Sequence, residues 1–243
     1  MERRPADKVN KPVRGYFSAS RNPWFSLAVS VPLLLLYNIG LLMPGNTTGN
    51  AVDLLSRLVL PFIGLRGFLV VNAVLVLGSI VLMAVLIKRK QFRPLYYFLL
   101  CVEGLVWGLV IGFGVTLLLK HASIGLGTIG HMSVPQAISC AAGAGYWEEL
   151  VFRLLLVGVP ISLVSRVGKA SGARVAIVTA VAILLSSLAF SLAHYIGQTE
   201  TPDAYSFLYR ALSGAVFAAI FLWRGFGVAA YSHFLYDVWV MVY

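Results

Sequence analysis

The chain has 243 residues, of which 59% are hydrophobic and only 12% are charged. Its mean hydropathy of +0.87 is far above that of an average soluble domain and indicates an integral membrane protein surrounded by the lipid bilayer. The net charge of +10 does not require a nucleic-acid partner, because the Lys and Arg residues gather at the N-terminus and between apolar segments, where membrane topology accounts for them.

Apolar segments follow one another along almost the whole chain after a basic stretch, residues 1–22. Each is close to the roughly 20 residues that a membrane-spanning helix needs. Spans are predicted at 24–43, 67–87, 95–119, 134–164, 175–196, 205–223 and 226–242. The expected fold class is therefore all-α, a polytopic transmembrane helical bundle of about seven spans. Basic connectors after the second, fourth and sixth spans predict a cytoplasmic N-terminus.

Three parts are expected in this bundle. Residues 1–22 form a basic cytoplasmic N-terminal segment, residues 23–133 contain the N-terminal spans, and residues 134–243 form a helical core. The segment 51–65 is too short to span and reads as an interfacial helix. The glycine-rich connector Ser123 to Ser133 is either a mobile flap or a slack loop.

Two glutamates and an arginine, Glu148, Glu149 and Arg153, lie inside the fourth predicted span. Inserting one ionised side chain at bilayer depth costs at least about 2.5–3.5 kcal/mol of free energy. These residues therefore need compensating partners and indicate a functional site. On an α-helix, residues four apart share a face, so Glu149 can pair with Arg153. Glu148 is rotated by about 100° and should serve different neighbours. We predict a supporting Glu149–Arg153 pair and a general base at Glu148, because a low-dielectric surrounding makes a carboxylate more basic.

Two further motifs place polar residues in later spans. Phe190-Ser-Leu-Ala-His194 lies in the fifth, and His233-Phe-Leu-Tyr-Asp237 lies in the seventh. The small residues 141–145 before the glutamates let neighbouring helices approach closely. We therefore expect both histidines to reach Glu148, where they can hold a water or a substrate carbonyl.

These motifs together resemble a known family. Glu-Glu-x-x-x-Arg, Phe-x-x-x-His and His-x-x-x-Asp/Asn, in this order on separate membrane helices, are similar to the CPBP family, which contains type II CAAX prenyl endopeptidases and bacteriocin-processing or immunity proteins. The likeness covers roughly residues 134–240. It implies an intramembrane endopeptidase of the glutamate type that cleaves a membrane-associated or exported polypeptide.

The resemblance also implies a role for each motif residue. Glu148 would activate a water that His194 helps to hold, and His233 with Asp237 would stabilise the oxyanion. Phe190, Glu149 and Arg153 would support them. Prenyl endopeptidases of this kind commonly have asparagine where this chain has Asp237. An ionised carboxylate there would repel an oxyanion, so we expect Asp237 either to be protonated or to accept from His233 and fix its tautomer.

Other functions remain open from the sequence. Glu148, His194, His233 and Asp237 could bind zinc, because imidazoles and carboxylates are ordinary zinc ligands. We favour the mechanism without a cofactor, since the chain has no His-Glu-x-x-His pair. A catalytically inert scaffold or immunity protein would use the charged cluster for structure alone, and a proton-coupled transporter would also bury Glu, Arg and His.

The location of the site along the spans predicts where it opens. His194 is twenty residues beyond the basic Arg174 and four before Gln198 in the next connector. At about 1.5 Å of rise per residue, this histidine lies near the extracytoplasmic end of its span. We expect a multi-pass protein of a bacterial-type cytoplasmic membrane with an extracytoplasmic opening. Labelling of cysteines placed in the Ser123 to Ser133 connector only from the cytoplasm would contradict this.

Overall fold

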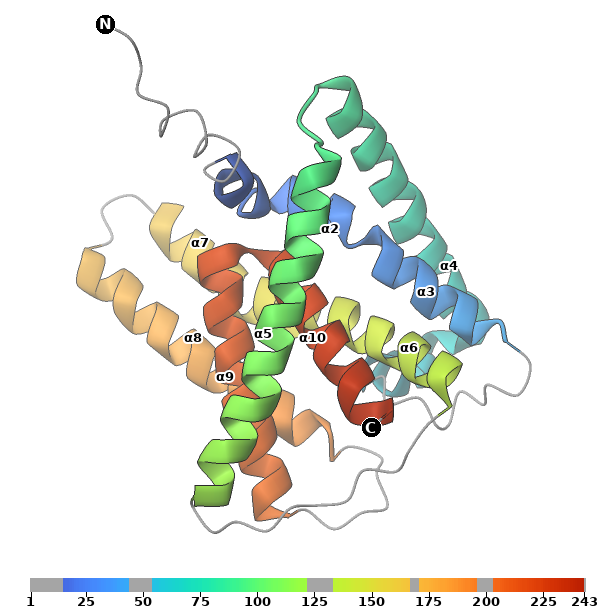
Figure 1. Cartoon of the computed structure of the whole chain (residues 1–243). Helices are drawn as coiled ribbons and strands as arrows, with labels where there is room; N and C mark the ends of the chain where they lie inside the picture. Colours follow the sequence, from blue (N-terminus) through green and yellow to red (C-terminus); the bar gives the residue numbers. More distant parts are fainter. Residues whose placement is uncertain (1–14, 44–53, 122–132, 167–170, 196–202, 243) are drawn as a thin grey trace, which may run out of the picture.

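The structure is a computed structural model that describes residues 15–43, 54–121, 133–166, 171–195 and 203–242. These residues are helical with short connections, and no strand occurs among them, which confirms the all-α prediction (Figure 1). The helices are α2 (Pro23–Val29), α3 (Val31–Leu41), α4 (Leu54–Lys88), α5 (Pro94–His121), α6 (Val134–Gly143), η1 (Ala144–Gly158), α7 (Val159–Arg166), α8 (Gly172–Ala193), α9 (Ala204–Arg224) and α10 (Phe226–Val242). The glycine-rich connector lies outside the described residues.

Five segments of the described chain are long and apolar enough to cross a membrane. They are Pro23–Leu41, Arg66–Lys88, Pro94–Leu118, Gly172–Ala193 and Ala204–Arg224. They match five of the seven predicted spans, and the chain is an integral membrane protein. The other two, 134–164 and 226–242, are helical but do not qualify by length and composition. Their spanning and the orientation of the N-terminus stay predictions.

The first predicted span is interrupted, and the second follows the short segment before it across a kink. Ser30 divides the first span into α2 and α3, and its hydroxyl donates to the carbonyl of Ser26 at 2.8 Å. In α4 the backbone of Gly64 has φ +66°, a left-handed conformation that glycine adopts without strain. This kink separates the short predicted segment from the longer span. The interfacial position of the short segment remains a prediction.

The fourth predicted span, 134–164, is not a single α-helix. It consists of α6, η1 and α7, and η1 is a π-helix of 15 residues. A π-helix forms i→i+5 hydrogen bonds, and most examples are single turns near functional sites. The α-helical geometry assumed for Glu148, Glu149 and Arg153 is therefore wrong, although Glu149 and Arg153 still meet.

Helix α10 lies at the centre of the bundle. It packs against α2, α5, α6, α9 and η1, and Figure 1 shows it beside α5 between the α7–α9 side and the α2–α4 side. Glycines allow this close approach. A Cβ built on Gly108 of α5 would lie 3.0 Å from the Ser232 carbonyl oxygen, and one on Gly145 of η1 would lie 2.6 Å from the Ala230 oxygen. Because α10 carries His233 and Asp237, this packing brings the third motif to η1.

Candidate active site

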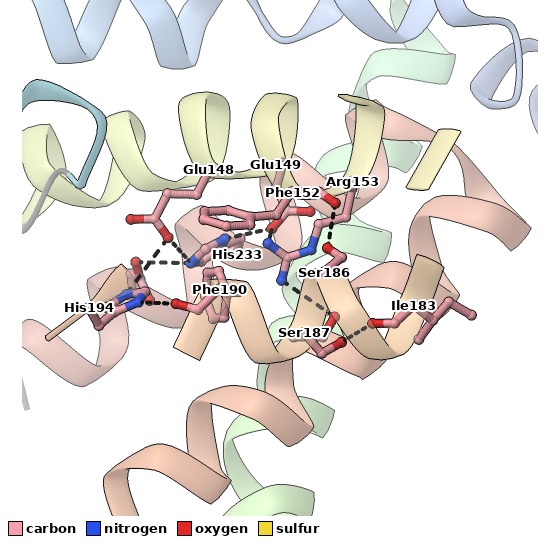
Figure 2. Close-up of polar contacts among 12 residues, drawn as sticks. Glu148, Glu149, Phe152, Arg153, Ile183, Ser186, Ser187, Phe190, His194 and His233 are labelled. Atoms are coloured by element: carbon pink, nitrogen blue, oxygen red, sulfur yellow. Dashed lines mark hydrogen bonds and ion pairs between the residues drawn. The ribbon is translucent and has the colours of Figure 1, made fainter. Parts of the chain in front are cut away.

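The Glu149–Arg153 pair forms within η1 and is completely buried. Arg153 Nη1 lies 3.1 Å from Glu149 Oε1, and neither side chain has exposed surface. Arg153 also donates through Nη2 to the carbonyl of Gly214 in α9, at 3.4 Å. The predicted pair is therefore present, and it links the π-helix to α9. Figure 2 shows Glu149 and Arg153 next to His233.

His233 lies between the two glutamates. Its Nδ1 is 2.8 Å from Glu149 Oε1, and because a carboxylate accepts, Nδ1 carries a proton and donates. Its Nε2 is 3.8 Å from Glu148 Oε2 and 3.4 Å from Asp237 Oδ2. The glutamates thus share one imidazole instead of serving separate neighbours. Glu149 accepts the Nδ1 proton of His233, while Asp237 lies on the Nε2 side of the ring.

His194 completes the cluster from the end of α8. Its Nδ1 lies 2.7 Å from the carbonyl oxygen of Phe190, so this nitrogen donates and the ring presents Nε2 to the site. Nε2 is 3.9 Å from Glu148 Oε2 (Figure 2). Separations of 3.8–3.9 Å are too long for direct hydrogen bonds and short enough for two groups to share one water. All four candidate catalytic residues therefore come together around Glu148.

Aromatic rings hold the charged groups in place. Phe217 of α9 stacks on the His233 ring at 4.5 Å, with 21° between the planes. The Arg153 guanidinium lies 4.4 Å from the Phe190 ring centre and 5.3 Å from that of Phe217. Phe190 thus contacts both Arg153 and His194, as a supporting residue should. Sequence analysis missed Phe217, because a phenylalanine in an apolar span gives no signal of its own.

Exposure of the side chains indicates from where the site is reached. Glu148 and His233 are 1% and 4% exposed, whereas His194 and Asp237 are 12% and 14% exposed. The latter two therefore line the more open side of a buried site. Two tyrosines also pair between α9 and α10. Tyr209 is stacked with Tyr236, and their hydroxyls are 2.5 Å apart.

A second buried ion pair lies away from this site. Glu103 of α5 accepts from Arg224 of α9 at 2.5 and 2.8 Å, and also from the hydroxyl of Tyr16. Arg224 is fully buried and lies 3.9 Å over the ring of Phe17. The sequence analysis treated Arg224 as a connector charge, which the structure corrects. This pair joins the N-terminal segment to the bundle.

A zinc site would need the imidazole nitrogens and carboxylate oxygens of this cluster as ligands. Within the described ranges, no group of three or more His, Cys, Asp and Glu residues is arranged to hold a metal ion. Glu149 accepts from Nδ1 of His233, which leaves Nε2 to face the site, so this contact does not decide between a water and a metal. Metal dependence stays a prediction, and no step is derived through a metal.

The polar cluster lies in a part of the chain that matches a protein-family model. The family model described as type II CAAX prenyl endopeptidase Rce1-like matches residues 130–239. Residues 130–239 are therefore similar to that family. The resemblance inferred from the three motifs is confirmed, and the Rce1-like region contains η1, α8, α9 and most of α10 with every residue of the cluster. This similarity supports a peptidase that acts on peptide substrates at a membrane. Searches of curated proteins and of solved structures found no match.

Proposed function

We propose that the chain is an intramembrane endopeptidase that hydrolyses a peptide bond of a membrane-associated or exported polypeptide, with Glu148 as the general base. The observation that carries this proposal is the position of Glu148 Oε2, with Nε2 of His194 at 3.9 Å and Nε2 of His233 at 3.8 Å. A carboxylate with imidazoles on two sides, in a buried and partly open site, suits the activation of one water.

His194 orients this water. Its Nδ1 proton is directed to the Phe190 carbonyl, so Nε2 of the neutral ring carries a lone pair. One hydrogen of the water then points to His194 Nε2 and the other to Glu148 Oε2. The oxygen lone pairs of the water are left to face a substrate carbonyl. Because the water is already oriented, less entropy is lost on reaching the transition state.

The hydrolysis follows from these positions. Glu148 takes a proton from the water as the new C–O bond forms, and the carbonyl π electrons move onto the substrate oxygen. The resulting oxyanion collapses, the C–N bond breaks, and Glu148 returns the proton to the leaving nitrogen. The products are a carboxylic acid and an amine, and Glu148 is ionised again.

His233 is proposed to stabilise the oxyanion. Its ring has Glu149 at Nδ1 and Asp237 at Nε2, and carboxylates at both nitrogens favour an imidazolium. Nε2–H then donates to the oxyanion, a contribution of about 2.7–4 kcal/mol for one such donor. Arg153 and this imidazolium leave one excess negative charge among three carboxylates. When Glu148 takes a proton from the water, this negative charge moves to the oxyanion, beside the His233 imidazolium.

Glu148→Gln tests the proposal because it keeps shape and removes the base. Purified protein in liposomes is incubated with a pool of synthetic peptides that carry apolar segments, including farnesylated peptides with a CAAX end, and products are identified by mass spectrometry. We expect cleavage by the wild type and a loss of about 10²–10⁴-fold in Glu148→Gln.

The matched control is Asp203→Asn, the same change of an acid to its amide. Asp203 is exposed and caps α9 by accepting from the Ser206 amide at 2.9 Å, which asparagine can also do. This variant should cleave like the wild type. If Glu148→Gln keeps cleavage within tenfold of the wild type while remaining folded, Glu148 is not the base.

A further inference from the structure

Arg210 of α9 is a charged residue that the proposed mechanism does not use. Its helix face is defined by its neighbours: the Phe207 carbonyl accepts from Ser191 Oγ at 2.8 Å, and a Cβ built on Gly214 would lie 3.3 Å from the Phe190 ring. Residues three and four apart lie on one face of a helix. Arg210 therefore faces the last turns of α8, which end at His194.

Contacts of the guanidinium support this location. Its central carbon lies 5.3 Å from the ring centre of Tyr195, the residue after His194. Arg210 is thus a cation beside the open, His194 side of the site.

Arg210 has no acidic partner within the described ranges. Its Nη1 is shielded from solvent and makes no hydrogen bond there, and no ion pair links it to a described carboxylate. The buried Arg153 and Arg224 differ, because each is paired with a glutamate. The buried Nη1 of Arg210 therefore lacks a hydrogen bond that an anion can accept.

We infer that Arg210 binds a carboxylate of the polypeptide substrate close to the bond that is cleaved. This inference rests on the proposed peptidase function and adds a substrate class to it. The planar guanidinium matches a carboxylate with two parallel hydrogen bonds. The carboxylate comes either from a free C-terminus or from an Asp or Glu side chain, and the two have the same chemistry at Arg210.

Binding of three peptides to the Glu148→Gln protein in nanodiscs tests this without cleavage. All three share one apolar sequence and a neutral fluorophore. The first ends in a free carboxylate, the second in an amide, and the third in an amide with an internal Asp. Fluorescence anisotropy gives each Kd. We expect at least one carboxylate peptide to bind about tenfold or more tightly than the amide, because a hydrogen bond to a charged group contributes that much.

Variants made in the same Glu148→Gln background separate recognition from structure. Arg210→Gln should abolish the preference by weakening only the carboxylate peptides, and Arg210→Lys should keep part of it. Arg174→Gln, an exposed arginine near the other end of α8, is the matched control and should keep the full preference. Which carboxylate peptide binds more tightly identifies its source.

Two results would overturn the inference. One is equal Kd values of the carboxylate and amide peptides for the Glu148→Gln protein with Arg210 unchanged. Equal values are also expected if the guanidinium binds lipid headgroups. The other is an Arg210→Gln variant that weakens all three peptides alike. Neither result concerns Glu148 as base, because that proposal depends on cleavage by the wild type. Loss of the carboxylate preference in binding and loss of cleavage are thus measured separately.

Discussion

Replacement of Arg153 by methionine tests the division of labour between the two glutamates. The change keeps a long, apolar-compatible side chain and removes the guanidinium, which leaves the Glu149 carboxylate buried. Breaking a buried ion pair by removal of one partner typically costs about 3–5 kcal/mol of the free energy of unfolding. The structure allows the value for this site to be narrowed.

Two contacts set the magnitude. Glu149 Oε1 would keep the hydrogen bond that it accepts from His233 Nδ1 at 2.8 Å. This bond reduces the cost of leaving the carboxylate without the guanidinium. Glu149 Oε2 has no hydrogen-bond partner within the described residues, so it adds no compensation. The lost contact of the guanidinium with Phe190 is partly replaced by a sulfur–aromatic contact worth about 0.3–1.5 kcal/mol. We therefore expect Arg153→Met to cost about 3 kcal/mol, the lower end of the range.

Equilibrium unfolding in mixed detergent micelles measures this cost. The matched variant is Arg153→Met combined with Glu149→Gln, which removes both charges and keeps an oxygen that can accept from His233. Because replacement of a whole buried pair is often close to neutral, the double variant should recover to within about 1 kcal/mol of the wild type. Glu148→Gln should also unfold close to the wild type while losing cleavage. An Arg153→Met cost below about 1 kcal/mol, or a double variant no better than the single one, would refute the supporting role.

Two further predictions concern packing and metal dependence. Gly145→Ala should lower the free energy of unfolding by about 1–3 kcal/mol, because its Cβ would lie 2.6 Å from the Ala230 carbonyl oxygen. Gly78→Ala, which has nothing within 4 Å of its Cβ, should be neutral or slightly stabilising in the same measurement. Equal effects would contradict the close approach of η1 and α10. Exhaustive chelation should leave peptide cleavage unchanged, and stoichiometric zinc whose removal abolishes cleavage would reject the mechanism without a metal.

Much of the fold follows from apolar length alone. Five predicted spans reappear as candidate membrane helices, because a run of about 20 apolar residues has few stable alternatives. The break at Ser30 was harder to predict, since serine is an ordinary residue of membrane helices until its backbone is seen. The kink at Gly64 lies near the predicted boundary between the segment 51–65 and the span 67–87. The Arg224–Glu103 pair joins residues 121 positions apart, and no local spacing predicts such a contact.

The site was predictable to the extent that its residues repeat at a fixed spacing. Each motif pairs residues i and i+4, which identified Glu149–Arg153 and His233–Asp237 as neighbours. Contacts between helices were not predictable in detail. Phe217 and Arg210 come from α9, which carries none of the three motifs, and only packing brings them beside His233 and His194.

The π-helix explains why both glutamates meet one histidine. An α-helix turns the chain by about 100° per residue, which would direct adjacent side chains to different neighbours. With i→i+5 hydrogen bonds, each turn holds more residues and each residue turns the chain by less. Glu148 and Glu149 consequently point in more similar directions, and they contact the two nitrogens of the His233 ring. The paired Glu149 can therefore orient the imidazole that faces Glu148, which links the supporting ion pair to the proposed base.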